Sequence, residues 1–433
     1  MLKINATTYF RFIILLLMIT TYLPIVYTRL PAYIGSHYFW TIVWGLSLLL
    51  LKPRVLFYRI MLLIFAYALF LWILFNTAWS AMGEWNVKHL WNEIYAVAIG
   101  ISIFTYFKES KDHIGFAKTI RYTLIFIIIT ALMTIFTSFI DSMYVRNMFM
   151  KTNEGDMSRL LINRYGAGTY GTATVFMALL PLLVYYYKHS SLFFVSKKWI
   201  ILLLIFIVGI AVLRMQLFAN IMLALFTGII AMVSAKNRLR TIIVISIIGG
   251  VIVLIPTKNH VNTLNKLADS MNEYEETSFK IKEFAYYLER GGEVKTSKNA
   301  VAGRVERYPM LLEVFSKSPI MGCFFQSDAL GNGYRQEAAH IYWMNKLTIT
   351  GIVGFIFFLS IIITFVYRAR KNIEGSYSYY YLLAIFSILL YGIFKNIGGR
   401  ETWYFFFVIL PGIYYLPLLN KKNCPNIGGH LNN

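Results

Sequence analysis

Long runs of apolar residues, separated by short polar segments, dominate the chain. Most approach the roughly 20 residues that a helix needs to cross a bilayer. They lack the alternation of transmembrane β-strands, and only helices or closed barrels satisfy the backbone in lipid. We therefore predict an all-α, polytopic membrane protein of about twelve transmembrane helices. They are expected at 10–28, 33–51, 60–77, 91–107, 120–140, 166–187, 199–213, 217–235, 241–256, 341–367, 377–394 and 402–419.

Basic residues are unevenly distributed over the connections between these segments. If the N-terminus lies inside, every connection expected on the cytoplasmic side is rich in Lys or Arg and contains few acids. Cytoplasmic loops of membrane proteins show this bias, so both chain ends are predicted to be cytoplasmic. The basic residues are Lys52, Arg54 and Arg59; Lys108, Lys111, Lys118 and Arg121; Lys188, Lys197 and Lys198; Lys236, Arg238 and Arg240; Arg368, Arg370 and Lys371; Lys421 and Lys422.

One outward connection, at 257–340, is too long to be a simple link and too polar to lie in lipid. It contains helix-like stretches, and a large external loop is a favoured place for a functional site. The predicted organisation is therefore transmembrane helices 1–9 in residues 1–256, the large external loop at 257–340, and transmembrane helices 10–12 with a cytoplasmic tail in residues 341–433.

The composition agrees with a membrane protein, since 58% of the residues are hydrophobic and 14% are charged. The formal net charge of +21 would suggest nucleic acid for a soluble protein. Much of this charge lies in the connections expected on the cytoplasmic side, where it sets the orientation in the membrane, so no nucleic acid partner is expected. The basic residues left outside favour an anionic, phosphate-bearing substrate in the outer leaflet. They are Arg146, Lys151, Arg159, Arg164, Arg214, Arg304, Arg307, Arg335, Lys395 and Arg400.

Arg214 interrupts an apolar stretch between Trp199 and Val233, at a predicted tight turn on the outer side. A charge there costs a few kcal/mol on insertion scales, so it is usually paired or functional. The alternative is a turn arginine whose side chain reaches the membrane interface. A functional role is favoured, because Gln216 is the only other polar anchor of the turn.

Arg304 and Arg307, late in the external loop, are three residues apart and would share one face of a helix. Paired guanidinium groups suit bidentate binding of phosphate or pyrophosphate. The alternative is an exposed ion pair of Arg307 with Glu306 or Glu313. We interpret Arg304 as functional and leave both interpretations open for Arg307.

His340 ends the external loop, directly before the tenth span. An imidazole at the interface can take a proton from a sugar hydroxyl near neutral pH. Tyr342 and Trp343 suit either the headgroup belt or a wall on which a sugar stacks. A lone interfacial histidine is more often structural, but its place at the loop end favours function.

Two further groups are weaker candidates. Arg164 precedes a glycine-rich stretch, Gly166, Gly168 and Gly171, whose plainer interpretation is close helix packing. Arg400 lies in the last outer loop, next to Glu401. No Asp-x-Asp pair ends an outer loop, and no cluster of Cys and His is present, so no metal site is expected.

Together these features resemble the domain shared by O-antigen ligases and O-antigen polymerases. In that family a large periplasmic loop ends in a histidine element, followed by a span with spaced glycines, and an arginine lies between two spans ahead of the loop, as Arg214 does. The resemblance covers roughly residues 160–365. It rests on Gly303, Arg304, Tyr308, Leu312, Phe315, Ser318, Pro319, Ile320, Gly322, His340, Tyr342, Leu347, Gly351 and Gly354.

The resemblance implies an integral-membrane glycosyltransferase of the bacterial inner membrane, with its active site facing the periplasm. The donor would be a glycan on undecaprenyl pyrophosphate, and no cofactor or metal would be needed. The implied catalytic residues are His340, Arg304 and Arg214. Residues expected to bind pyrophosphate or glycan are Arg307, Arg164, Arg400, Tyr342 and Trp343.

Three functions are compatible with these features. A polymerase, with a chain-length regulator as candidate partner, would move the growing chain onto a hydroxyl of a new lipid-linked repeat unit. It is favoured because the C-terminal part of the chain, with Phe394–Glu401 and Leu410-Pro411-Gly412, resembles polysaccharide polymerases more than ligases. A ligase would move the glycan onto lipid A–core. A flippase or exporter is less favoured, because no internal repeat is found.

Overall fold

The computed structural model describes residues 5–77, 84–148, 153–193, 195, 197–233, 257–271, 275–289, 307–322, 341–373, 375–397 and 399–420. These ranges contain helices and connections and no strand. The helices are α1 (Ala6–Tyr22), α2 (Pro24–Arg29), α3 (Ala32–Gly35), α4 (His37–Leu51), η1 (Pro53–Phe57), α5 (Arg59–Thr77), α6 (Glu84–Glu109), α7 (His113–Ile140), α8 (Tyr144–Asn147), α9 (Asn153–Tyr165), α10 (Tyr170–Lys188), η2 (Ser190–Leu192), α11 (Lys198–Arg214), α12 (Phe218–Met232), α14 (Thr257–Ser270), α15 (Glu275–Glu289), α17 (Arg307–Lys317), α19 (Tyr342–Lys371), α20 (Tyr377–Phe394), α21 (Arg400–Tyr404), η5 (Phe405–Ile409), α22 (Leu410–Ile413) and η6 (Leu416–Leu419).

The all-α prediction is confirmed for the described residues, and each predicted span among them is largely helical, in one helix or in several consecutive ones. The span predicted at 241–256 lies outside the described residues. Helices α7, α10, α19 and α20 are long and apolar enough to cross a membrane, and α1, α4, α5 and α12 are shorter and apolar. The protein is therefore a helical membrane protein by length and composition of its helices, while the number of twelve spans stays a prediction.

The first predicted span, 10–28, differs from expectation because it is divided between α1 and α2. The chain bends at Leu23, directly before Pro24. Proline disfavours the helical conformation in the residue before it and has no N–H to donate. The carbonyl of Tyr22 accepts a hydrogen bond from the Thr130 hydroxyl of α7, so the bend leaves this acceptor satisfied.

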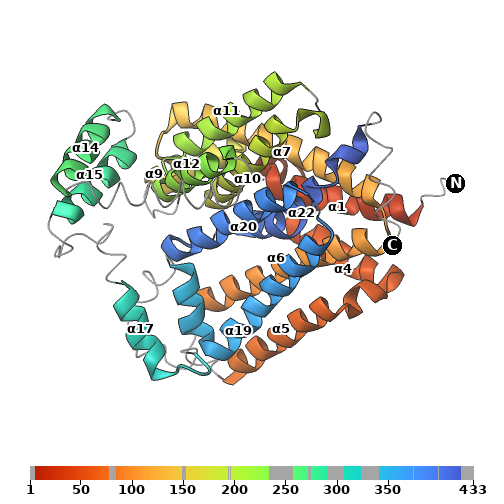
Figure 1. Ribbon diagram of the computed structural model, residues 1–433. Helices are drawn as coiled ribbons and strands as arrows, with labels where there is room; N and C mark the ends of the chain where they lie inside the picture. The colour runs from red at the N-terminus through yellow and green to blue at the C-terminus, as the bar shows by residue number, and fades with distance from the viewer. Residues whose placement is uncertain are drawn as a thin grey trace.

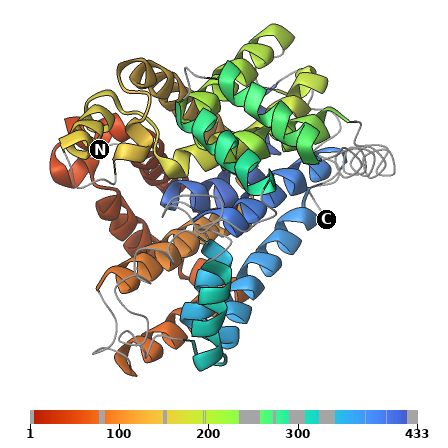
Figure 2. The same cartoon turned by 90° about the vertical axis from the view of Figure 1, so that its left-hand side faces the viewer.

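Two helical stretches form the centre of the bundle. Every residue from Gly171 to Tyr186 of α10 is buried, as is every residue from Thr402 to Ile413. Helices α11, α12 and α20 pack against α10, and α6 packs against α21 and η5 (Figures 1 and 2). Peripheral helices expose large apolar side chains, as lipid-facing surfaces do: Leu50 is 76% exposed and Ile363 63%.

Helices of the predicted external loop lie to one side of this bundle. In Figure 1, α14 and α15 lie at the far left, packed against each other, and α17 lies below them. The α14–α15 pair is held by the Ser278 hydroxyl, which donates to the Ala268 carbonyl at 2.7 Å, and by an ion pair of Lys282 with Asp269.

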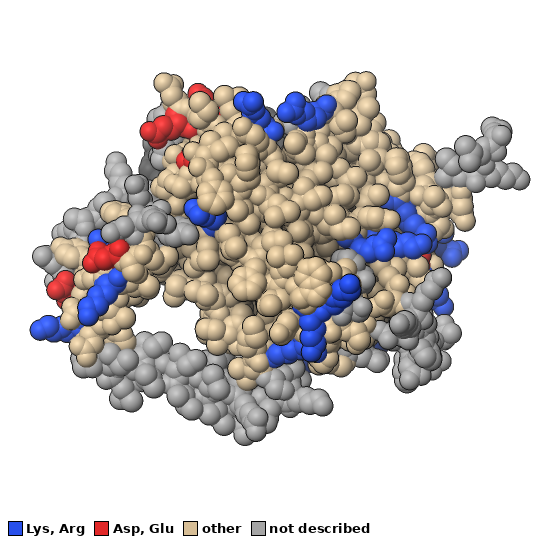
Figure 3. Space-filling view, turned by 90° about the horizontal axis from the view of Figure 1, so that it is seen from above, with Lys and Arg blue, Asp and Glu red and all other residues tan. Residues whose placement is uncertain are grey.

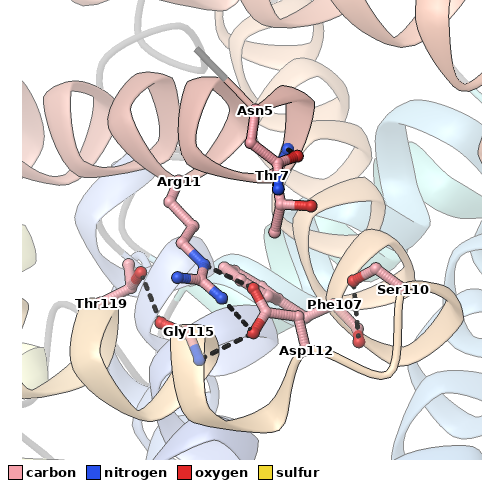
Figure 4. Close-up of polar contacts among 8 residues, drawn as sticks. All are labelled: Asn5, Thr7, Arg11, Phe107, Ser110, Asp112, Gly115 and Thr119. Carbon is pink, nitrogen blue, oxygen red and sulfur yellow. Dashed lines mark hydrogen bonds and ion pairs between the residues drawn. The ribbon is translucent and has the colours of Figure 1, made fainter. Parts of the chain in front are cut away.

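At the opposite end, a salt bridge joins the start of α1 to the connection between α6 and α7. The Arg11 guanidinium donates to both oxygens of Asp112 at 2.6 and 2.5 Å (Figure 4). Asp112 also caps α7 by accepting from the Gly115 N–H at 2.9 Å. A Cβ at Gly115 would lie 2.2 Å from Arg11 Nε, so a side chain there would push the pair aside. We call this the Arg11 end.

Helix α19 is broken at Gly351, which has φ +64°. The segment that follows α17 crosses this break, and the N–H groups of Ile352 and Val353 donate to the carbonyls of Pro319 and Ile320 at 2.9 and 3.2 Å. A Cβ at Gly351 would lie 2.3 Å from the Ile320 carbonyl oxygen. The break therefore exists only where a glycine permits both the positive φ and the backbone contact.

We predict that Gly351→Ala lowers the free energy of unfolding by at least the 1–3 kcal/mol or so that a strained backbone conformation costs. Gly322→Ala should behave alike, because Gly322 has φ +83° and its Cβ would lie 2.1 Å from the Ile349 carbonyl oxygen. Thermal unfolding in detergent measures the effect. The control is Gly209→Ala in α11, where a Cβ meets nothing within 4 Å. Equal melting temperatures of Gly351→Ala and Gly209→Ala would contradict the prediction.

Candidate functional site

Polar side chains from widely separated parts of the chain meet at the end of the bundle opposite Arg11. We call it the Glu93 end and define it by Tyr22, His37, Glu93, Tyr342 and Glu401. The Tyr22 hydroxyl donates to the Glu401 carbonyl at 2.7 Å, and the Tyr342 N–H donates to the Lys395 carbonyl at 3.4 Å. Five helices, α1, α4, α6, α19 and α21, therefore bring polar groups together here.

A buried ion pair lies at this end, between Glu93 of α6 and Lys346 of α19. The Lys346 ammonium donates to one Glu93 oxygen and the Tyr342 hydroxyl to the other. The side chains of Lys346 and Glu93 are only 3% and 11% exposed. Lys346 Nζ also lies 4.3 Å from the centre of the Phe358 ring, a favourable position for a cation. Since burial of a single charge is costly, each charge here depends on the other.

Tyr342 lies inside the protein, and Trp343 is partly buried. Tyr342 is buried and its hydroxyl is committed to Glu93, while Trp343 Nε1 donates to the Leu389 carbonyl at 2.7 Å. Both side chains fix the start of α19 against α6 and α20. The arrangement suits positioning of the chain that precedes α19 more than direct contact with a lipid headgroup.

His37 forms a second buried polar cluster at the Glu93 end. The Thr21 hydroxyl donates to the Leu17 carbonyl at 2.7 Å, so its proton is not free for His37 Nδ1, 3.1 Å away. Nδ1 therefore carries the ring proton, and Nε2 accepts from the Tyr404 hydroxyl at 3.0 Å. Arg400 lies close enough to His37 and Tyr404 to act on both electrostatically.

The structure brings together two candidate groups that are far apart in the sequence. The Thr402 hydroxyl donates to the Gly171 carbonyl at 3.3 Å, and a Cβ at Gly171 would lie 2.8 Å from a Glu401 oxygen. Gly166, with φ +69°, packs against the backbone of Ile25. In this part of the chain these two glycines allow close packing, which is the plainer of the two interpretations of the sequence.

Arg214 and Arg164 both flank the C-terminal turns of α7. Arg214, the last residue of α11, lies with its guanidinium carbon 4.4 Å from the centre of the Phe139 ring. Arg164 lies over the ring of Tyr165, which in turn packs edge-on against Phe136 at 5.4 Å. Arg214 is half-buried and Arg164 is exposed. Two predicted phosphate contacts thus come from α9 and α11 to the same end of α7.

Arg304 and His340 lie outside the described residues, and the side chain of Arg307 does too. Their described neighbours are packed together. Helix α17, which begins at Arg307, contacts α19: Leu311, Val314 and Ile341 form a small apolar cluster. The Tyr308 hydroxyl donates to the Ile393 carbonyl at 2.5 Å, and partial burial raises the pKa of this hydroxyl.

Sequence reasoning did not single out Glu93, Lys346 or His37. Glu93 is an acid within an apolar run, and Lys346 follows Tyr342 by one helical turn, so the spacing alone could have placed Tyr342 and Lys346 on one face. Within the described ranges, no group of three or more His, Cys, Asp or Glu could hold a metal ion.

No protein-family model matches the chain, and no curated protein is significantly similar to it.

We predict that Lys346→Met and Glu93→Gln each lower the free energy of unfolding. The loss should be roughly 3–5 kcal/mol wherever the remaining partner stays buried and fully charged. The double variant should regain most of the loss, because the amide introduced by Glu93→Gln still accepts a hydrogen bond from Tyr342 and no charge remains. Thermal unfolding of the four proteins forms a double-mutant cycle.

The matched control is Lys282→Met, which breaks the exposed Lys282–Asp269 pair. It should change stability by roughly 1 kcal/mol or less. Single variants at Glu93 and Lys346 that are as harmless as this control, or a double variant that is only the sum of the two, would show that the charges do not depend on each other.

Proposed function

We propose that the protein is a bacterial surface-polysaccharide polymerase, which transfers a growing glycan from undecaprenyl pyrophosphate to a hydroxyl of a new lipid-linked repeat unit. The observation that carries the proposal is that Arg164 and Arg214 flank the C-terminal turns of α7, while Arg400, at the start of α21, lies near His37 at the Glu93 end. Fixed guanidinium groups at a membrane interface suit a pyrophosphate whose lipid tail stays in the bilayer.

The same proposal places the Glu93 end at the periplasmic face of the inner membrane and the Arg11 end in the cytoplasm. The distribution of charge supports this orientation. At the Arg11 end, Lys108 of α6 lies near Arg368 and Lys371 of α19, and burial together with these two cations lowers its pKa. In Figure 3, most visible Asp and Glu lie towards the left, the side of α14 and α15, whereas Lys and Arg are spread over the face and predominate over acids in its right-hand half.

In the proposed reaction, the acceptor hydroxyl oxygen attacks the anomeric carbon of the donor sugar and gives its proton to His340. The bond between that carbon and the phosphate oxygen breaks, and its electron pair leaves with undecaprenyl pyrophosphate. Arg214 and Arg304 stabilise the negative charge that develops on the leaving group. Arg164, Arg307 and Arg400 hold the donor, and the reaction needs no metal ion or cofactor.

The buried pair Glu93–Lys346 supports the proposed role of His340. It fixes Tyr342 and the first turn of α19, and Ile341 packs on α17. His340 and Arg307 are therefore each directly followed by residues that are held in the same small region. Glu93 and Lys346 act in this proposal as positioning residues.

We predict that Arg214→Ala, Arg304→Ala and His340→Ala each abolish long-chain polysaccharide without lowering the amount of protein in the membrane. Loss of one group that stabilises transition-state charge, or of a general base, reduces rates by about 10²–10⁴-fold. The measurement is elongation of a purified lipid-linked repeat unit by the purified protein.

The control is Arg159→Ala, because Arg159 is exposed and pairs with Asp156 on the surface of α9. Normal chain ladders in any of the three variants would remove that residue from the mechanism. Elongation by the protein alone would exclude a flippase or exporter. Deletion of the gene separates a polymerase, whose mutant still places one repeat unit on lipid A–core, from a ligase, whose mutant places none.

A further inference from the structure

A small cavity of about 80 Å³ lies where α10, α20 and the segment after α22 meet. Five tyrosines from these elements line it: Tyr185, Tyr186, Tyr377, Tyr414 and Tyr415. The ring of Tyr415 stacks on that of His113, which directly follows Asp112, with ring centres 4.9 Å apart. The cavity therefore lies at the Arg11 end of the bundle. We call it the tyrosine pocket.

The lining of the tyrosine pocket is largely apolar, although it consists mainly of tyrosines. Four ring-to-ring contacts, with centres between 5.0 and 5.6 Å apart, join the five rings into one continuous wall. The Tyr186 hydroxyl donates to the Ile413 carbonyl at 2.7 Å, and the Tyr377 hydroxyl to the Leu410 carbonyl at 2.6 Å. Because these hydroxyls are committed to the backbone, their rings offer the pocket chiefly carbon surface.

The pocket has a buried floor and a more accessible mouth. Tyr414, Leu192 of η2 and Leu418 of η6 are half-buried, whereas the other four tyrosines are buried. An apolar cavity offers water few hydrogen bonds, and an engineered one of about 150 Å³ holds benzene. A cavity of about half that size has room for a short stretch of one hydrocarbon chain.

Basic residues lie beside the mouth. The connection between α10 and α11 contains Leu192 and three exposed basic residues, His189, Lys197 and Lys198. The ring of His189 lies 4.8 Å from that of Tyr185, centre to centre, so this histidine adjoins the wall of the pocket. A ligand that enters past Leu192 therefore passes a positively charged stretch of chain.

Acidic residues do little to offset this charge. The sequence contains no Asp or Glu between Asp156 and Asp269, and Asp112, beside His113 at the other edge of the pocket, is paired with Arg11. The end of α19 and the connection to α20 contain one acid and three cations: Glu374, Arg368, Arg370 and Lys371. Basic pockets between transmembrane helices on the cytoplasmic side bind the headgroups of anionic lipids.

We propose that the tyrosine pocket binds an anionic phospholipid of the cytoplasmic leaflet, with part of one acyl chain in the pocket and the phosphate group at the basic residues of the α10–α11 connection. The hydrocarbon buries apolar surface against the rings, and lysine and histidine N–H groups donate to phosphate oxygens. The leaflet follows from the proposed orientation, whereas the pocket and its basic residues do not depend on the transferase reaction.

The first test compares phosphatidylglycerol with phosphatidylcholine of identical acyl chains on the purified full chain in detergent. Native mass spectrometry gives the dissociation constant of the first bound lipid. We expect phosphatidylglycerol to bind roughly 10-fold more tightly or better, because only its headgroup carries a net negative charge. Lys197→Gln combined with Lys198→Gln should reduce this preference roughly 5-fold or more. The matched control is Lys258→Gln with Lys266→Gln, two exposed lysines of α14, which should leave the preference unchanged.

The second test fills the pocket. Leu418→Trp should abolish the preference for phosphatidylglycerol without lowering the melting temperature of the lipid-free protein, since filling an apolar cavity tends to stabilise a fold. The control is Leu419→Trp, because Leu419 is also half-buried but does not line the pocket. If Leu418→Trp does not fold, Leu192→Trp carries the test from the opposite side of the mouth.

Several outcomes would overturn the proposal. Equal affinity of the wild type for the two lipids would show that the site does not select an anionic headgroup. A full preference in the pocket-filled variant would place the lipid elsewhere on the surface. Glycerol 3-phosphate that binds as tightly as phosphatidylglycerol would show an anion site that needs no acyl chain. A dimer that Leu418→Trp dissociates would show that a second copy of the chain occupies the pocket.

Discussion

The requirement that every backbone N–H and C=O find a partner inside an apolar bundle governs this structure. It makes helices of the apolar runs, and it also determines where a helix can break. At the bend after α1, a threonine hydroxyl of α7 satisfies the Tyr22 carbonyl. At Gly351 of α19, the carbonyls of Pro319 and Ile320 satisfy the freed N–H groups. Each break therefore couples distant segments, and the second couples α17 to the membrane helices.

Charged side chains are likewise paired with a partner at the two ends of the bundle. At the Arg11 end, Arg11 and Asp112 join α1 to the α6–α7 connection, and at the Glu93 end, Glu93 and Lys346 join α6 to α19. An ion pair with a different partner helix thus lies towards each end of α6. A helix fixed in this way has a defined tilt and depth, which is what a site assembled from several helix ends needs.

The sequence predicted the helices well, because apolar runs and basic connections are local features. It also placed Arg214 at a tight turn, whereas Gly322 and Gly351 entered only through the family resemblance. It could not show that Gly322 and Gly351 touch, that Glu401 lies against Gly171, or that Glu93 pairs with Lys346 across 253 positions. Such contacts depend on which helix ends become neighbours, and similar apolar helices carry little information about their neighbours. Arg304 and His340 stay predictions, because they lie outside the described residues.

Buried threonines show how this fold satisfies polar side chains inside its helices. Thr21, Thr123, Thr134 and Thr227 are buried in helices, and each hydroxyl donates to the carbonyl four residues earlier. The fold thus has a simple means of satisfying a buried polar side chain from within its own helix. A threonine or leucine at position 220 would be satisfied or would need no partner, whereas Asn220, in the first turn of α12, has both polar atoms unpaired among the described residues. An amide with both polar atoms unpartnered among the described residues is therefore an exception to the way in which this fold satisfies its buried polar side chains.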